Sequence, residues 1–438
     1  TVTVSNMTIG ALSFRLGSAS GDQAINITSN GIYTFYGVAG NTTLRLRSQS
    51  SFDGSVTNIS VMEFASNDVP RIDYTGGGCP VLLTEPQSTN ERLYSENFSV
   101  DYSLTRAIVY SDYAFDDGSG TYLISPDGTS NSTIFQDDAS GGNNASQLFK
   151  AASVDVLSTY TFSVFVKKGF NDYIALRTAS YSTPINGQSY FNLDLGTVIS
   201  ESAGHTARIE DYGNGWYRCS VTFTTDASDT TGNCFLRHSK DGVTTTVPID
   251  GTNSVRVWGW QFEEMPYPTS YIPTVGAARS RLGDVVTGAG NASTLNDSEG
   301  VLYVEASFEQ DEPSSLSRIS ISNGGSGERI LLYKATANKE IGVIVSNGGS
   351  QFNITYTYTG SADDFFKMAI KWKENDFAFW VNGVEVATDN SGTTPVGLNE
   401  LQLTGGGGTT DPFYGKTKDL QVYDVALTDL ELEVLTSL

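Results

Sequence analysis

Short runs of alternating apolar and polar residues, separated by glycine and asparagine turns, dominate this chain. Residues 159–169 (TYTFSVFVKKG) and 172–182 (DYIALRTASYS) alternate in this way, and residues 207–225 place Gly-Asn-Gly between two such runs. Alternation puts successive side chains on opposite faces of a strand, and a glycine-rich turn joins antiparallel neighbours. Because such runs recur along most of the chain without a helical insert, the sequence predicts an all-β fold of tandem antiparallel sandwiches or jelly rolls.

The N-terminal 64 residues hold too few strands for a complete domain. Four strand patterns within residues 1–64 predict a partial β-sandwich, the end of an upstream jelly roll. Its unpaired edges would have to be completed by upstream residues or by a neighbouring chain. The patterns lie around Ala11–Leu16, Gly31–Tyr36, Thr43–Arg47 and Val56–Phe64.

The remaining length of the 438-residue chain exceeds what one hydrophobic core supports. Residues 65–97 carry three prolines around a triple glycine, a composition that predicts an extended connector. Residues 98–285 are predicted to form a jelly roll with an exit linker, which the resemblance described below implies to be carbohydrate-binding-like. A second linker follows at residues 286–298, and residues 299–438 are predicted to form another sandwich.

Two local motifs support the assignment of this last sandwich. Residues 376–389 (DFAFWVNGVEVATD) place Asn-Gly between two alternating runs, which is the strongest short signal for a β-hairpin. The chain closes with LTDLELEVLTSL, in which Thr428 is a candidate N-cap and Glu431 stands at the capping-box position. We therefore expect one short terminal helix.

Residues 256–264 (RVWGWQFEE) raise the question of whether their aromatic residues form a binding surface or a core. Alternation would place Trp258, Trp260 and Phe262 on one face of a strand and turn Gln261 and Glu263 to the other. Three successive aromatic residues on one face favour a buried core over a sugar platform. The proline-rich stretch that follows is then expected to lead out of the domain.

Charge and hydropathy exclude two classes of partner. The net charge is −23, from 49 acidic against 26 basic residues, and no cluster of lysine and arginine is present. Nucleic-acid binding requires such clusters to displace counterions, so we predict no nucleic-acid partner. No apolar run approaches the roughly 20 residues that a membrane-spanning helix needs, so we predict no membrane insertion.

The cysteines and histidines do not suggest catalysis or metal binding. Cys79, Cys219 and Cys234 have neither the spacing of a disulfide framework nor that of a metal site, so free, buried thiols are expected. The two histidines, His205 and His238, each lie alone in a polar β context, which favours a structural role.

No catalytic motif is recognisable, and the chain is predicted not to be an enzyme. Phosphate-binding loops, zinc-binding HExxH motifs and nucleophile elbows are absent from the sequence. Glu263 and Glu264 are adjacent, so a strand would point them to opposite faces, and they cannot form the facing carboxylate pair of a glycosidase. The alternative is a secreted polysaccharide lyase or hydrolase, or its accessory carbohydrate-binding part.

Sugar-binding surfaces combine aromatic rings with planar hydrogen-bonding groups, because a pyranose has an apolar face and a polar rim. Alternation places Tyr173, Arg177 and Tyr181 on one face of a strand, with Tyr190 expected nearby. These four residues are the ligand-binding candidates of the jelly roll. An ordinary solvated sheet face rich in tyrosine is the alternative.

In the last sandwich, loops at one end are expected to carry function. Asp389 and Tyr414 lie in such predicted loops and are its ligand-binding candidates. Lectin-like sandwiches also hold Ca²⁺ through loop carboxylates, so Ca²⁺ stays open as an alternative at Asp389 and Asp411. No other cofactor is predicted.

Two resemblances cover more than four fifths of the chain. Residues 299–438 resemble a concanavalin A-like, laminin-G-type lectin or glucanase domain through the hairpin at 369–387 and the closing segment 420–435. Residues 66–285 resemble a module common in tail fibres and other surface proteins of bacterial viruses. The matching stretches of this second resemblance are residues 70–90, 162–169, 212–218 and 258–274.

The resemblances imply a non-enzymatic virion surface protein of a bacterial virus, either a tail fibre, an adhesin or a capsid decoration. Such a protein would be extracellular on the virion surface, bind host-surface glycans and contact other virion proteins. It would also form a homo-oligomer, with a trimer suggested by the symmetry of viral fibres. A purely structural spacer is a further alternative.

Overall fold

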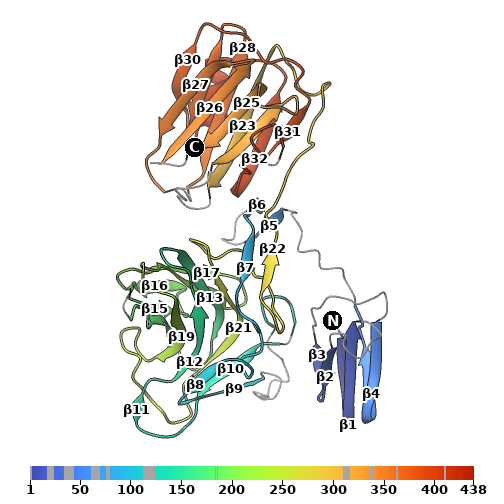
Figure 1. Cartoon of the computed structure of the whole chain (residues 1–438), viewed down its shortest axis with the longest axis vertical. Coiled ribbons are helices and arrows are strands. Elements are labelled where there is room, and N and C mark those ends of the chain that lie inside the picture. Colours follow the sequence, from blue (N-terminus) through green and yellow to red (C-terminus); the bar gives the residue numbers. More distant parts are fainter. Residues whose placement is uncertain are drawn as a thin grey trace. The chain divides into compact units, whose positions relative to one another are not determined.

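The computed structural model describes residues 2–16, 24–33, 44–60, 70–74, 79–111, 124–129, 131–182, 184, 186–308, 316–335, 339–361, 364–408 and 411–438. The chain divides into two compact units. One unit comprises residues 1–65 and 88–280, and the other comprises residues 66–87 and 281–438. The described residues form antiparallel sheets and one short helix (Figure 1), which confirms the all-β class.

The N-terminal sheet is built around one long strand, β1 (Val2–Leu16). This strand pairs along its length with β4 (Leu44–Thr57), and near its two ends with β3 (Gly31–Tyr33) and β2 (Ala24–Ile27). The buried apolar cluster of this sheet consists of Val2, Val4, Leu12 and Phe14 from β1 and Ile27 from β2.

Three of these strands differ from the prediction, and one of them, β2, was not predicted at all. β1 begins nine residues before the predicted start at Ala11, because Val2 and Val4 extend its apolar face. The strand predicted at Val56–Phe64 is only the end of β4: residues 58–60 carry no strand, and residues 61–64 lie outside the described residues.

The middle domain is a jelly roll of two six-stranded antiparallel sheets (Figure 1). Sheet I has the order β17-β18-β13-β21-β10-β9, and sheet II has the order β16-β15-β14-β19-β12-β8. The strands of sheet I are β9 (Ala107–Ser111), β10 (Thr133–Asp137), β13 (Thr159–Lys168), β17 (Thr206–Asp211), β18 (Trp216–Thr224) and β21 (Ser254–Glu263). Those of sheet II are β8 (Ser103–Thr105), β12 (Gln147–Ser153), β14 (Tyr173–Ala179), β15 (Gln188–Asn192), β16 (Thr197–Ser200) and β19 (Thr231–Ser239).

Two small pairings accompany this jelly roll, namely β7 (Ser88–Asn90) with β22 (Arg279–Arg281) and β11 (Asn143–Asn144) with β20 (Val247–Pro248). The predicted hairpin at residues 207–225 is present as β17 and β18. Its Gly-Asn-Gly turn has positive φ angles at all three residues, 77°, 53° and 75°, a backbone that glycine and asparagine tolerate.

The aromatic residues of β21 are buried on two faces of sheet I, not on one. Gly259, with a φ of +62°, forms a β-bulge that shifts the register of β21 against β13. Trp260 and Phe262 therefore point into the core between the sheets, whereas Trp258 packs against Phe165 on the outer face. Burial of all three residues is confirmed, but their placement on a single face is wrong, because the bulge adds one residue to the alternation.

The segment after β21 folds back over the outer face of sheet I and does not simply leave the domain. Thr161 donates its hydroxyl to the carbonyl of Met265 at 2.8 Å, and the Ile272 amide donates to Gln261 Oε1 at 2.8 Å. The side-chain amide of Asn90, which lies in β7, donates to the Ile272 carbonyl at 2.9 Å. The proline-rich residues 265–274 thus become part of the cover of sheet I.

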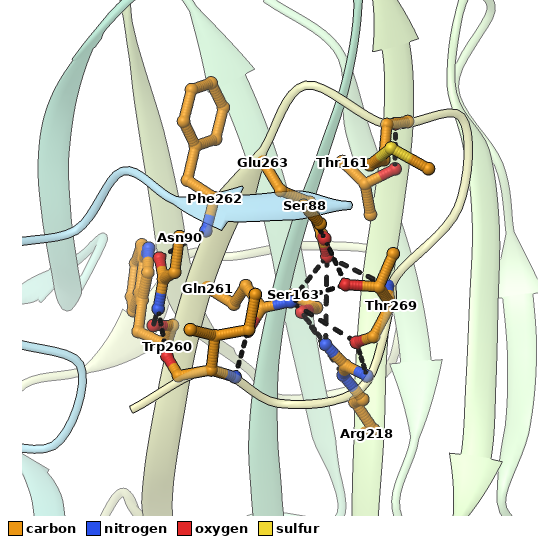
Figure 2. A network of polar contacts seen from close by, with 12 residues as sticks. Ser88, Asn90, Thr161, Ser163, Arg218, Trp260, Gln261, Phe262, Glu263 and Thr269 are labelled. Carbon is orange, nitrogen blue, oxygen red and sulfur yellow. Dashed lines mark hydrogen bonds and ion pairs between the residues drawn. The ribbon is translucent and has the colours of Figure 1, made fainter. Parts of the chain in front are cut away.

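A buried polar network lies beneath this cover (Figure 2). The Glu263 carboxylate accepts hydrogen bonds from Gln261 Nε2 at 2.7 Å, from the Thr269 amide at 3.0 Å, and from the hydroxyls of Ser88 and Thr269 at 2.6 Å each. Arg218 Nη2 lies 4.0 Å from the same carboxylate. The network joins three segments of the chain, which contribute Ser88, Arg218 and residues 261–269. Because Glu263 and Gln261 have no exposed surface, the network is closed to solvent.

The C-terminal domain is a second sandwich, with sheet orders β30-β29-β28-β23-β32-β6-β5 and β27-β26-β25-β24-β31. Its core lies between the two sheets. The first sheet comprises β5 (Arg71–Asp73), β6 (Val81–Thr84), β23 (Glu299–Phe308), β28 (Phe366–Lys373), β29 (Phe377–Val381), β30 (Val384–Asp389) and β32 (Gly415–Tyr423). The second comprises β24 (Ser317–Ser322), β25 (Glu328–Lys334), β26 (Glu340–Asn347), β27 (Ser350–Thr357) and β31 (Glu400–Gln402).

The two local motifs predicted for this domain are present. Asn382 and Gly383 both have positive φ angles, 49° and 79°, in the turn between β29 and β30. The terminal helix α1 (Asp429–Thr436) has Thr428 as its N-cap and a complete capping box with Glu431. No helix in the described part of the chain is long and apolar enough to cross a membrane.

Part of the segment predicted to be a connector belongs to this C-terminal sheet. β5 pairs with β6, and Leu82–Thr84 of β6 pair with Thr417–Gly415 of β32. The three prolines stand just before β5, just before β6 and two residues after β6, so none interrupts a ladder. The density of prolines correctly predicted extended backbone, but it did not predict the two short strands β5 and β6 that lie between these prolines.

Candidate functional site

The outer face of sheet II carries the most promising set of binding side chains in the described residues. Antiparallel register places directly opposed residues on the same face. β14 contributes Tyr173 and Arg177, and their neighbours follow from the pairing with β15, β19 and β12. The set comprises Tyr173, Ala175, Arg177, Gln188, Tyr190, Asn192, Phe235, Arg237, Gln147 and Phe149, which we call the sheet II face.

Phe235 lies at the centre of the sheet II face. The guanidinium carbons of Arg177 and Arg237 lie 5.2 and 5.3 Å from the centroid of its ring, within cation–π range. Phe149 stacks beside it on the neighbouring strand, with 4.8 Å between ring centroids and 21° between the planes. Two guanidinium groups therefore cover the Phe235 ring, which is buried, and together with the half-buried Phe149 they form the surface over β14, β19 and β12.

Neutral amides hold the arginines in place. Arg237 donates through Nε to Gln147 Oε1 at 2.8 Å and through Nη1 to Gln188 Oε1 at 3.1 Å. Gln188 in turn donates to the Tyr190 hydroxyl. Arg177 donates to Asn186 Oδ1 at 2.8 Å. These bonds orient both guanidinium groups without neutralising their charge.

The electrostatics of the sheet II face disfavour two cations side by side. Burial together with the nearby charge of Arg177 lowers the pKa of Arg237 to about 10. Burial likewise lowers the pKa of Arg177. Both side chains are half-buried, so the low dielectric of the protein surface strengthens their mutual repulsion.

Three of the four residues predicted for this domain lie on the sheet II face. Tyr173 and Arg177 project from β14, and Tyr190 stands opposite Ala175 on β15. Tyr181 does not belong there: β14 ends at Ala179, and the φ of +66° at Ser180 turns the chain. Tyr181 is 4% exposed and packs in the hydrophobic core, which corrects the expectation that it shares the face of Tyr173 and Arg177.

Sequence reasoning missed the centre of the face, Phe235 with Arg237 and Phe149. The two-residue spacing of Phe235 and Arg237 showed that they share a face of one strand. Nothing local indicated that this strand lies beside β14, because Phe235 pairs with Arg177, which lies 58 residues earlier in the chain.

The two residues predicted for the last domain are not brought together. Asp389 ends β30, while Tyr414 precedes β32, and three strands separate β30 from β32 in the sheet. Asp389 accepts hydrogen bonds from the amide and hydroxyl of Ser391, at 2.9 and 2.8 Å, in a local turn. Tyr414 is half-buried, and burial raises its pKa.

No cluster of three or more metal-ligating side chains occurs in the residues that the structure describes. Asp411, considered for Ca²⁺, forms an ion pair with Arg318 at 2.7 Å.

Both histidines are buried and structural. His205 lies within hydrogen-bonding distance of the hydroxyls of Thr178 and Ser189, and His238 contacts Ser146 and the Phe135 carbonyl. Burial lowers the pKa of each to about 4.

Cys219 and Cys234 are buried free thiols, as expected, and lie in different sheets. Cys79 is also free but exposed, so the expectation of burial is wrong for it.

The fold of the C-terminal domain matches a known family. Residues 296–433 match the family model described as Laminin_G_3, concanavalin A-like lectin/glucanases superfamily. These residues therefore form a concanavalin A-like domain. No curated protein is significantly similar to the chain.

Solved structures show only distant likeness. The carbohydrate-binding module CBM40 of the Ruminococcus gnavus IT-sialidase, bound to α2,3-sialyllactose, is 20% identical over 34% of this chain and 94% of its own, with a TM-score of 0.30. A heptameric SAP-like pentraxin from Limulus polyphemus is 17% identical over 35% and 75%, with a TM-score of 0.28. Domains LG4-5 of the mouse laminin alpha1 chain are 10% identical over 64% and 88%, with a TM-score of 0.25. At these values the likenesses carry no argument about ligand or activity.

Proposed function

We propose that this protein is a non-enzymatic glycan-binding protein on the surface of a bacterial virus, a tail fibre, adhesin or capsid decoration. The glycan-binding part of the proposal rests on one observation, the combination of stacked aromatic rings, tyrosines and fixed arginines on the sheet II face. Aromatic rings stack on the apolar face of a sugar, while amides and guanidinium groups bind its hydroxyls.

The other face of the jelly roll supports the choice of sheet II. Residues 265–274 cover the outer face of sheet I at Gln261 and Glu263, two polar side chains that have no exposed surface. Glu263 therefore cannot act on a polysaccharide, although its carboxylate accepts four hydrogen bonds. This favours binding over hydrolysis for the middle domain.

The concanavalin A-like domain supports glycan binding through its family match alone. The virion location rests on the resemblance of residues 66–285 to modules of viral surface proteins. Assembly into a homo-oligomer, with a trimer as the first candidate, would multiply weak sugar sites through effective concentration. It would also give the edges of the N-terminal sheet, β1 to β4, a partner.

The test of the proposal uses the whole chain on a panel of bacterial and commercial polysaccharides. We expect binding by glycan array and calorimetry without release of reducing ends or of unsaturated products. Product release would overturn the non-enzymatic assignment in favour of a lyase or hydrolase. Copurification with virus particles, followed by mass spectrometry, tests the location, and light scattering at micromolar concentration tests the oligomer, which a monomer mass would refute.

A further inference from the structure

We propose that the sheet II face selects acidic glycans, with Arg177 and Arg237 together binding a carboxylate or sulfate group on the sugar. This inference rests on the proposed glycan-binding function and names the chemical class of ligand. An anion between the two guanidinium groups would replace their mutual repulsion with charge-assisted hydrogen bonds, which are about twice as strong as neutral ones.

No counter-charge accompanies the two arginines among the described residues. The hydrogen-bond acceptors of both arginines are amide oxygens, from Asn186, Gln147 and Gln188. Among the described residues, neither Arg177 nor Arg237 takes part in an ion pair with a carboxylate. The chain carries 49 acidic residues against 26 basic ones, so acids are abundant, and their absence here is a property of this face.

Both guanidinium groups also keep N–H donors that the described contacts do not use. A guanidinium has five N–H groups in a fixed fork that matches carboxylate and sulfate geometry. In the described contacts, Arg237 uses Nε and Nη1, which leaves Nη2, and Arg177 uses only Nη2. Both groups lie over the same Phe235 ring, so their unused N–H groups can bind the same ligand group.

Aromatic residues flank the two cations on the sheet II face. Phe149 and Tyr173 are half-buried aromatic residues on the flanks of the pair, whereas Tyr190, on β15 beyond it, is buried. Four neighbouring strands, β15 to β12, span roughly 14 Å at the usual strand spacing. The face is thus wide enough for several sugar units, with the anion at its centre and rings on both sides.

The experiment measures binding of the full chain by calorimetry to a polyuronate, to dextran sulfate, which carries sulfate but no carboxylate, and to neutral dextran. We expect the acidic polymers to bind and the binding to weaken with salt, because partly exposed charges are screened. The variant Arg177→Gln/Arg237→Gln should lose about tenfold or more in affinity, the equivalent of about 1.4 kcal/mol. Whichever acidic polymer binds more tightly identifies the anion as carboxylate or sulfate.

Arg208→Gln is the matched control, because Arg208 is equally half-buried but lies on β17 of sheet I. It removes the same charge and should change affinity less than about twofold. Arg237→Lys keeps the charge but loses the fork, so an intermediate affinity is expected. An unchanged melting temperature of the double variant confirms that folding is intact.

The outcomes separate this inference from the proposed function. Binding of neutral and acidic glycans with equal affinity, unchanged in the double variant but lost in Phe149→Ala, would overturn the acidic selection and leave glycan binding standing. Silence toward every glycan would overturn both.

Discussion

The Glu263 network offers a sharp test of how the middle domain is held together. Glu263 and Arg218 are 0% and 1% exposed in their side chains, and their charged groups lie 4.0 Å apart. Arg218 also donates to the Thr269 carbonyl at 2.6 Å and to Ser163 Oγ at 3.0 Å. We predict that Glu263→Met destabilises the domain strongly, because it leaves a buried guanidinium without its counter-charge.

The magnitude follows from what each substitution leaves unpaired. Removing one partner of a buried ion pair costs about 3–5 kcal/mol. Glu263→Met also takes the acceptor from the Ser88 and Thr269 hydroxyls, and each unsatisfied buried group costs about 1–3 kcal/mol. A loss at the upper end of the 3–5 kcal/mol range is therefore expected, a large fraction of the roughly 5–15 kcal/mol that stabilises a typical domain.

The assay is calorimetric and urea unfolding of the single variants and of Glu263→Met/Arg218→Met. The double variant should be less destabilised than the sum of the two singles, because each single variant strands a charge that the double variant removes. Glu264→Met is the control one residue further along the same strand end, where the side chain is exposed, and it should cost less than about 0.5 kcal/mol. A loss below about 1 kcal/mol for Glu263→Met, or strict additivity in the double variant, would refute the reasoning.

Further predictions concern the core and the buried titratable groups. Trp260→Ala should destabilise the middle domain by about 3–5 kcal/mol, because Trp260 is buried in the core between the sheets. The shift of the unfolding transition of this domain measures the loss. The ring signals of His205 and His238, the two histidines of the chain, should not titrate between pH 5 and 8 in NMR spectra of the folded protein. Since burial lowers both pKa values below that of an unfolded histidine, their contribution to stability is present above about pH 6.5 and lost as the pH falls toward 4. Titration of either signal near pH 6.5 would show that its ring is solvated. Burial and the nearby Asp127 raise the pKa of Glu96 to about 8, so the folded state holds this proton and loses stability as the pH rises from about 4.5 to 8. Glu96→Gln should therefore stabilise the protein relative to the parent at pH 8 but not at pH 4, and an equal effect at both would contradict the raised pKa.

The candidate site illustrates what local patterns can and cannot predict. Tyr173, Arg177 and Tyr190 were found because alternation within a strand and the adjacency of β14 and β15 are local properties. Tyr181 was misplaced because the positive φ of Ser180 ends the alternation, and serine gives no sign of such a turn. Arg237 was missed because its strand, β19, joins β14 only through long-range pairing.

What the sequence determined by itself is the class of fold and its local motifs. Alternation specifies strands, Asn382–Gly383 and Gly213–Gly215 specify turns through their tolerance of positive φ, and Thr428 with Glu431 specifies the terminal helix. Each of these depends on interactions between residues close in the chain, which the order of residues shows directly.

Only the tertiary structure decided which strands are neighbours and which faces are covered. The bulge at Gly259 moved Trp258 to the outer face, the proline-rich residues 265–274 closed over Glu263, and β6 joined β32 more than 300 residues away. The physical reason is that backbone ladders form between any two edges of suitable length, so pairing is selected by the burial of whole faces. That selection placed Arg177 and Arg237 over one phenylalanine ring.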